Sequence, residues 1–145
     1  MRLIFSFLAI ISLYSCTDDE TAVNFETEIS GKWKLIESKI SSGGPEMIIE
    51  AVKDGDEFLF RNDLSFTSTA RNECNNGTYT YSKTNSLQHT ELELNFECST
   101  SSSTIRTVIY AVTFSSPDQM ILTPLDPRCI EGCSFTYQKI ISKTD

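Results

Sequence analysis

The chain has 145 residues, of which 20 are acidic and 12 are basic, and its formal net charge at pH 7 is −8. An acidic chain without a basic cluster is a poor ligand for nucleic-acid phosphates and for anionic lipid head groups, because lysine and arginine bind both. The length indicates a single folded domain, which buries roughly two-thirds of the surface that its unfolded chain exposes.

The N-terminal segment has the pattern of a secretory signal peptide. Met1-Arg2 supplies a positive charge, and residues 3–13 (LIFSFLAIISL) form an apolar stretch. This stretch is too short to cross a membrane, which takes about 20 residues as a helix. Leu13-Tyr14-Ser15-Cys16 resembles the lipobox of bacterial lipoproteins, in which the signal is cleaved before the cysteine and the thiol receives a diacylglyceryl group.

The resemblance predicts a signal peptide over residues 1–15 and a lipid on Cys16. Two or more acyl chains hold a protein stably at a membrane, whereas one holds it only marginally. The alternative is an ordinary signal peptide whose Cys16 pairs with another cysteine.

An acidic run, Thr17-Asp18-Asp19-Glu20, follows the cysteine directly. It resembles the export signal of surface lipoproteins of the Bacteroidota, which implies lipid anchoring in the outer membrane and display at the cell surface. The alternative is a solvated acidic tether on a protein that faces the periplasm. In either case residues 16–30 are interpreted as the lipidated cysteine and its tether, and residues 31–145 as the folded domain.

From Gly31 onward the chain reads as a succession of short β-strands. Residues 91–97 (ELELNFE) are the clearest, since Leu92, Leu94 and Phe96 alternate with polar residues. Residues 46–52 (EMIIEAV) fit a short helix or a strand equally well. The other expected strands cover residues 31–40, 56–60, 64–68, 77–82, 104–114, 120–123 and 134–141.

In the expected strand over residues 64–68, Leu64 and Phe66 lie on one face. Eight or nine successive short strands without a convincing long helix predict an all-β fold, either a sandwich or an antiparallel up-and-down barrel of about eight strands.

Four cysteines remain besides Cys16: Cys74, Cys98, Cys129 and Cys133. An even number in an exported chain predicts two disulfides, and three pairings are possible. A zinc site is the rival interpretation, which export and the cysteine spacing both disfavour.

The pairing that we predict is Cys74–Cys98 with Cys129–Cys133. A hairpin that turns near residue 86 would place Cys74 opposite Cys98, and the second pair would close a short loop. The same register would place Tyr79 opposite Glu93, on the acidic face, unless a bulge shifts one strand.

Gly31-Lys32-Trp33 resembles the start of the lipocalins, whose first strand carries a Gly-x-Trp at the closed end of an eight-stranded barrel. With the wider strand pattern added, the chain looks like the lipocalin-like lipoproteins of the Bacteroidota. The segments of this pattern are GKWKLIES, DEFLF, LSF, GTYTY, LELNF, YAVTFSSPDQMILTP and FTYQKI. The resemblance implies that Gly31, Trp33 and a basic residue of the last strand, Lys139, close one end of the barrel. The loops are short, and an internal Thr-Asp-x-Arg signature is missing.

The sequence offers no catalytic or metal-binding pattern. His89 is the only histidine, and a lone histidine does not make a multi-ligand zinc site. We therefore expect no enzymatic activity, no cofactor and no metal. The leading hypothesis is non-catalytic binding of a small, partly apolar ligand in the open end of the barrel. The alternative is a filled barrel that binds a partner protein or glycan at the cell envelope.

Overall fold

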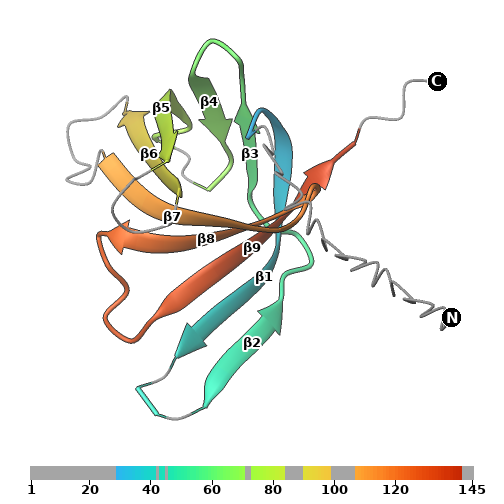
Figure 1. The fold of residues 1–145 in the computed structure, drawn as a ribbon, viewed down its shortest axis with the longest axis vertical. Coiled ribbons are helices and arrows are strands. Elements are labelled where there is room, and N and C mark those ends of the chain that lie inside the picture. The colour runs from blue at the N-terminus through green and yellow to red at the C-terminus, as the bar shows by residue number, and fades with distance from the viewer. Residues whose placement is uncertain are drawn as a thin grey trace, which may run out of the picture.

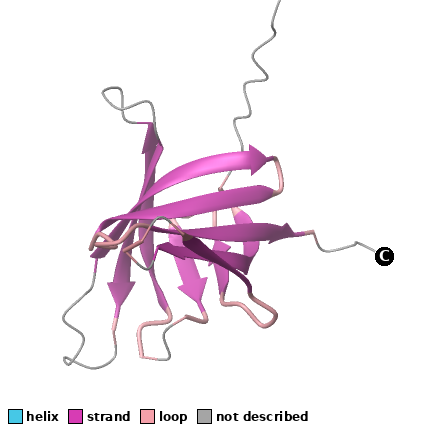
Figure 2. Cartoon of the chain, turned by 90° about the horizontal axis from the view of Figure 1, so that it is seen from below, coloured by secondary structure: helices cyan, strands magenta, loops and turns pink. Residues whose placement is uncertain are grey.

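The structure is a computed structural model, and it describes residues 29–41, 43–44, 46–70, 73–83, 90–98 and 107–141. These residues form nine strands and no helix (Figures 1 and 2). The strands are β1 (Gly31–Ser41), β2 (Met47–Ala51), β3 (Glu57–Phe60), β4 (Ser65–Ser68), β5 (Asn76–Lys83), β6 (Thr90–Glu97), β7 (Thr107–Ser116), β8 (Gln119–Asp126) and β9 (Cys133–Ile140).

Eight of the nine strands close into an antiparallel barrel. The strand order is β2-β1-β3-β4-β5-β6-β7-β8-β9, and β9 also pairs with β1, which completes the ring. This confirms the predicted all-β fold and the closed barrel, and it is consistent with a lipocalin-like architecture. The ninth strand, β2, lies within residues 46–52, for which the sequence fitted a helix and a strand equally well.

One edge of strand β1 pairs with two different strands. Gly31–Lys34 pair with β3, whereas Glu37–Ser41 pair with β2. Its pairing with β9 shifts register between Leu35 and Glu37. Because such a bulge bends a strand and increases its twist, the second half of β1 turns away from β3 while it stays paired with β9. The β1–β2 hairpin therefore projects beyond the barrel, as Figure 1 shows.

The interior is filled by aromatic and aliphatic side chains in similar numbers. The fully buried large side chains are Trp33, Phe60, Phe66, Leu92, Leu94, Met120 and Leu122. The Phe58 ring lies 5.4 Å from the Phe60 ring and 5.5 Å from the Tyr137 ring, and the Phe66 ring lies 5.0 Å from the Phe96 ring, measured between centroids. All five of these aromatic residues belong to one packed core.

The two ends of the barrel differ in their connections. Because neighbouring strands run antiparallel, the start of β1 with Trp33 lies at the same end as the turns at residues 61–64 and 117–118. We call it the Trp33 end. The opposite end carries the tip of the β1–β2 hairpin, the connection at residues 127–132, and both disulfides. We call this end the mouth.

Leu64 corrects one expectation. It lies in the turn before β4, with a φ angle of 64°, and its side chain is exposed. Its N–H donates to the Arg61 carbonyl (3.1 Å), and its own carbonyl accepts from the Tyr79 N–H (2.8 Å). The prediction that Leu64 shares a strand face with Phe66 was therefore wrong, because the residue serves the turn.

Replacing Leu64 with glycine should stabilise the protein. A leucine in the left-handed region costs about 1–2 kcal/mol, and glycine avoids this cost. The unfolded chain is more flexible with glycine, which offsets roughly half of the gain in stability. We expect the free energy of unfolding to rise by about 0.5–1 kcal/mol in chemical denaturation. Leu64→Ala keeps the unfavourable φ angle and should bring no gain; an equal gain for both variants would show that the backbone is not strained there.

Candidate functional site at the barrel mouth

A group of aliphatic and aromatic side chains lines the inner face of the mouth. Leu35 pairs with Tyr137, Ser38 with Phe135, and Ile40 with Ile48 of β2. Residues directly opposite each other in an antiparallel pair lie on the same face. The inner wall of the barrel therefore continues from the core onto the projecting hairpin. We call Leu35, Ile40, Ile48, Phe135 and Tyr137 the mouth cluster.

The outer part of the mouth cluster surrounds a small recess. Its volume is about 110 Å³, and Ser38, Ile40, Ile48 and Glu50 line it. Ile40 is 47% exposed and Ile48 is 50% exposed, which leaves much of the apolar wall in contact with water. The Ser38 hydroxyl and the Glu50 carboxylate are the polar groups of this recess. The combination suits a molecule that has an apolar part and a hydrogen-bond donor.

Tyr137 forms the inner limit of the mouth cluster. Burial raises the pKa of its phenol, and the nearby Tyr110 and Asp56 raise that pKa further because their negative charges oppose ionisation. The phenol is therefore neutral at physiological pH. It presents an uncharged hydroxyl on an aromatic ring that packs against Phe58.

The raised pKa of Tyr137 predicts a loss of stability at alkaline pH. The unfolded phenol ionises near pH 10.0, whereas the folded protein holds the proton to higher pH. Stability from this group is complete below about pH 10 and falls above it by up to about 1.4 kcal/mol per pH unit. Denaturant titrations between pH 9 and pH 11 should show a shallower fall for Tyr137→Phe than for the wild type. Equal slopes would contradict this account of the burial of Tyr137.

Below the mouth, packed side chains fill the barrel. Leu92, Leu94, Leu122 and Phe66 are fully buried. A ligand that enters from the mouth therefore meets the rings of Phe135 and Tyr137 before it reaches the centre. The site is shallow, and its outer wall is the hairpin rather than a deep cavity.

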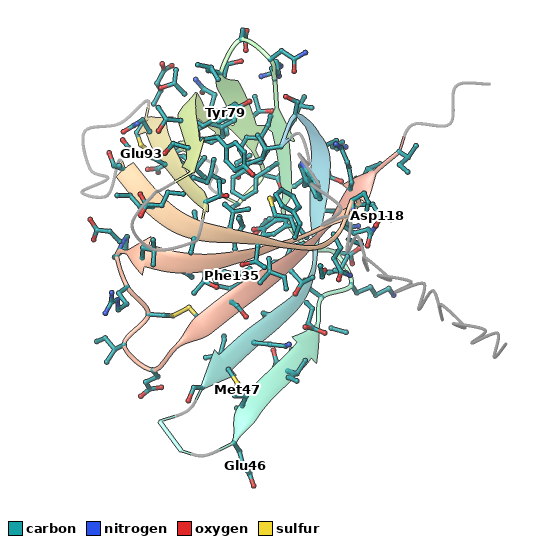
Figure 3. The ribbon with its side chains drawn as sticks, in the orientation of Figure 1. Glu46, Met47, Tyr79, Glu93, Asp118 and Phe135 are labelled. Atoms are coloured by element: carbon teal, nitrogen blue, oxygen red, sulfur yellow. A yellow bond between two sulfur atoms is a disulfide. The ribbon has the colours of Figure 1, made fainter. Side chains whose placement is uncertain are left out.

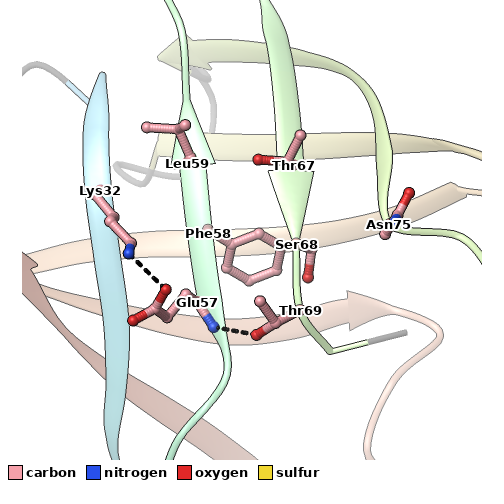
Figure 4. A pocket seen from close by; sticks show the side chains of 8 residues that line it. All are labelled: Lys32, Glu57, Phe58, Leu59, Thr67, Ser68, Thr69 and Asn75. Carbon is pink, nitrogen blue, oxygen red and sulfur yellow. Dashed lines mark hydrogen bonds and ion pairs between the residues drawn. The ribbon is translucent and has the colours of Figure 1, made fainter. Parts of the chain in front are cut away.

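A second recess lies beside β1, β3 and β4 (Figure 4). Its volume is about 300 Å³, and its lining comprises Lys32, Glu57, Phe58, Leu59, Thr67, Ser68, Thr69 and Asn75. The two charged side chains of its lining pair with each other. Lys32 Nζ lies 2.7 Å from Glu57 Oε2, and the Glu57 N–H donates to Thr69 Oγ1 at 2.8 Å. Phe58 is almost completely covered, and Leu59 is the other apolar residue of a lining whose remaining side chains are polar.

The structure brings together the three residues expected at the closed end. Trp33 is completely buried, and its indole N–H donates to the Ile29 carbonyl at 2.8 Å. Lys139 Nζ lies 5.2 Å from the centre of the Trp33 ring, within the range of a cation–π interaction. Gly31 has a φ angle of 126°, and a Cβ atom there would lie only 2.8 Å from Lys139 Cε. Glycine therefore leaves room for Lys139 to cross the indole.

Both predicted disulfides are confirmed, Cys74–Cys98 and Cys129–Cys133. The hairpin register behind the first was wrong by one residue. Tyr79 pairs with Leu94, and Glu93 pairs with Thr80. This register keeps Tyr79 on the apolar inner face, whereas a slip by one residue would turn it to the acidic face.

Several predicted features fall outside the described residues. These are the signal peptide, Cys16, the export signal Thr17-Asp18-Asp19-Glu20, and His89. Within the described ranges, no group of three or more potential metal ligands comes together, and no helix is long and apolar enough to cross a membrane.

The described chain thus belongs to the class of closed, eight-stranded antiparallel β-barrels. No family model matches it, and neither the curated proteins nor the solved structures give a significant match.

Sequence reasoning did not identify Ile40, Ile48 and Glu50 as site residues. A signal was present in residues 46–52, where Met47, Ile48 and Ile49 are consecutive apolar residues. A strand with apolar residues at both odd and even positions has no purely polar face. Such a pattern is typical of a strand that is covered on both sides or that binds a partner.

Proposed function

We propose that this chain is a lipid-anchored protein of the outer membrane whose lipocalin-like barrel binds a small, partly apolar molecule at its mouth, without catalysis. The observation that carries the proposal is the continuation of the apolar inner wall onto the projecting hairpin. Ile40 and Ile48 share the face of Phe135, yet both are about half exposed. An occupant of the mouth would cover this surface.

The character of the ligand follows from the lining. Isoleucine and aromatic side chains favour an apolar part, and the Ser38 hydroxyl and the Glu50 carboxylate favour a donor group at one end. A free anion is disfavoured by Glu50 and by the net charge of −8. The expected ligand class is therefore neutral or cationic, with a single short apolar portion.

The anchoring part of the proposal rests on the lipobox resemblance at Leu13-Tyr14-Ser15-Cys16 and on the acidic run that follows. A lipid at Cys16 would hold the barrel at the outer membrane, and the acidic run favours the cell surface. The matching test is Cys16→Ala, which should appear as soluble or uncleaved precursor. Recovery of this variant in the membrane, released only by detergent, would contradict the lipid assignment.

The ligand part can be tested by NMR on the full chain with labelled isoleucine methyl groups. A panel of neutral and cationic single-chain amphiphiles is titrated in. The methyl signals of Ile40 and Ile48 should shift, and that of Ile141, which is exposed near the Trp33 end, should not. Equal shifts of all three signals would indicate general detergent-like association and would contradict a site at the mouth.

One observation favours the alternative function, an interaction module. Every residue of β2 is exposed, and the strand stands apart from the packed core, as Figure 3 shows for Met47 and for Glu46, the residue before the strand. A surface of this kind is typical of contacts between proteins.

A further inference from the structure

The outer edge of β2 presents unused backbone hydrogen-bonding groups. The Val52 N–H donates to the Ile36 carbonyl of β1 at 2.8 Å, so the backbone of Val52 points inward to β1. Backbone direction alternates along a strand, so Met47, Ile49 and Ala51 point their N–H and C=O groups away from β1. Ser41, opposite Met47, donates to Gly132 on the far side of β1, which agrees with this assignment. Within the described ranges, no strand pairs with this outer edge.

The side chains on this edge are also unprotected. Met47 is 56% exposed and Ile49 is 58% exposed. An edge strand with exposed apolar residues is a template for pairing with another strand, and proteins usually cover such an edge or place charges along it. The edge-facing positions of β2 carry no charge, because the one carboxylate within the strand, Glu50, points its backbone to β1.

We propose that β2 pairs with β2 of a second copy of this chain, antiparallel, with Ile49 opposite Ile49 of that copy. In this arrangement Ile49 exchanges two hydrogen bonds with its counterpart, and Met47 does so with Ala51 of the second copy. The barrel sheets of the two copies become continuous through this pair of strands. The contact is two-fold symmetric, which is the commonest symmetry of protein pairs.

The charges of β2 select this register. Hydrogen bonding allows shifts of the pairing only in steps that keep edge-facing residues opposite each other. The neighbouring register on one side places Glu46 opposite Glu50 of the second copy, and the one on the other side places Glu50 opposite itself. Like charges directly opposite destabilise a strand pair. With Ile49 at the centre, Glu50 lies opposite Ile48, and no carboxylates face each other.

The small area of the contact between the two strands indicates that it forms at a membrane surface. A pair of five-residue strands covers less than the roughly 1,200–2,000 Å² that a stable complex buries. Such a weak contact needs a high local concentration of the chain, which a shared membrane surface supplies. The inference therefore rests on the proposed lipid anchor, and we expect the pair in the membrane rather than in dilute solution.

The test is site-directed disulfide trapping of the full chain in cell envelopes. Paired Ile49 residues would have Cα atoms about 5.5 Å apart, within the range that a disulfide needs. Under mild oxidation, Ile49→Cys should give a dimer band on a non-reducing gel. The matched control is Ile48→Cys, which would lie diagonal to its counterpart at about 7–8 Å and should stay monomeric. Mixed Met47→Cys and Ala51→Cys copies should also give a dimer.

The pairing is overturned if Ile49→Cys stays monomeric, if Ile48→Cys is trapped equally well, or if Ile49→Cys is trapped to a different protein. The anchor is judged separately on the same samples, by whether the chain sediments with the membranes. If it does not, the same variants are oxidised as concentrated purified full chain, where the site pattern again decides the pairing. The failure of the anchor and the failure of the strand pair are thus distinguishable.

Discussion

Replacing Trp33 with alanine should lower the free energy of unfolding by about 3–5 kcal/mol, the range for deleting a large buried aromatic side chain. Trp33 is completely buried, and its ring lies 6.1 Å from that of Phe114. The variant also loses the hydrogen bond from the indole to the Ile29 carbonyl. That carbonyl would then have to find another donor, which adds to the cost. Chemical denaturation measures the loss.

The matched control is Lys139→Met, which keeps an unbranched stem over the indole and removes the charge. A cation over an indole contributes about 0.5–2 kcal/mol, so this variant should lose clearly less stability than Trp33→Ala. If both variants lost the same amount, the charge of Lys139 rather than the packing of Trp33 would dominate the closed end. That result would contradict the account of the core.

Removing the Cys74–Cys98 disulfide should cost about 3.5 kcal/mol, and removing Cys129–Cys133 about 2 kcal/mol, by the chain-entropy estimate. The first bond joins residues 24 apart in sequence, and the second joins residues 4 apart. A longer loop restricts the unfolded chain more when it is closed. The first bond also connects the segment before β5 to the end of β6, whereas the second joins the connection at residues 127–132 to the first residue of β9.

Two double serine variants, one for each disulfide, test this order under non-reducing conditions. We expect the Cys74→Ser, Cys98→Ser variant to unfold at the lower denaturant concentration, with both variants still folded in buffer. The reverse order would show that the short loop at residues 129–133 does more than restrict the unfolded chain. Because Gly132 accepts from the Ser41 N–H at 3.0 Å, support of the hairpin would then be the first explanation to examine.

Much of the fold could be predicted because the inner face of a barrel repeats every second residue. Leu92, Leu94 and Phe96 alternate with polar residues, and the structure buries all three. The same rule failed for Leu64, because alternation alone does not show where a strand begins. Leu64 lies in a turn and has a positive φ angle, which the side-chain pattern does not reveal.

The pairing register was harder to predict than the strands. The cysteine pair suggested a turn near residue 86, but Cys74 precedes β5 and Cys98 follows β6, outside the paired segments. A disulfide at the end of a hairpin tolerates a shift of one residue. The burial of Tyr79 does not tolerate this shift, because the shift would turn its side chain to the opposite face of the sheet. Burial of Tyr79 therefore determines the register.

The mouth could not be predicted, because it depends on one irregularity in β1. The bulge between Leu35 and Glu37 turns the second half of the strand, with Ile40, away from β3 while it stays paired with β9. No local residue pattern marks that bulge. The strand that pairs with the projecting half, β2, was itself ambiguous in sequence, so its contribution of Ile48 to the inner wall could only be seen in three dimensions.

The most direct test of ligand binding at the mouth is mass spectrometry of the small molecules that copurify with the full chain from its own cells. The wild type should carry one compound in stoichiometric amount, and Ile48→Lys should lose it. Ile141→Lys, the same change at an exposed site near the Trp33 end, should retain it. In the proposed strand pair the lysine would lie opposite Glu50 of the second copy, an attractive contact, so a loss of the compound could not be ascribed to a loss of pairing. A wild type that carries no small molecule, or equal amounts in all three proteins, would contradict binding at the mouth.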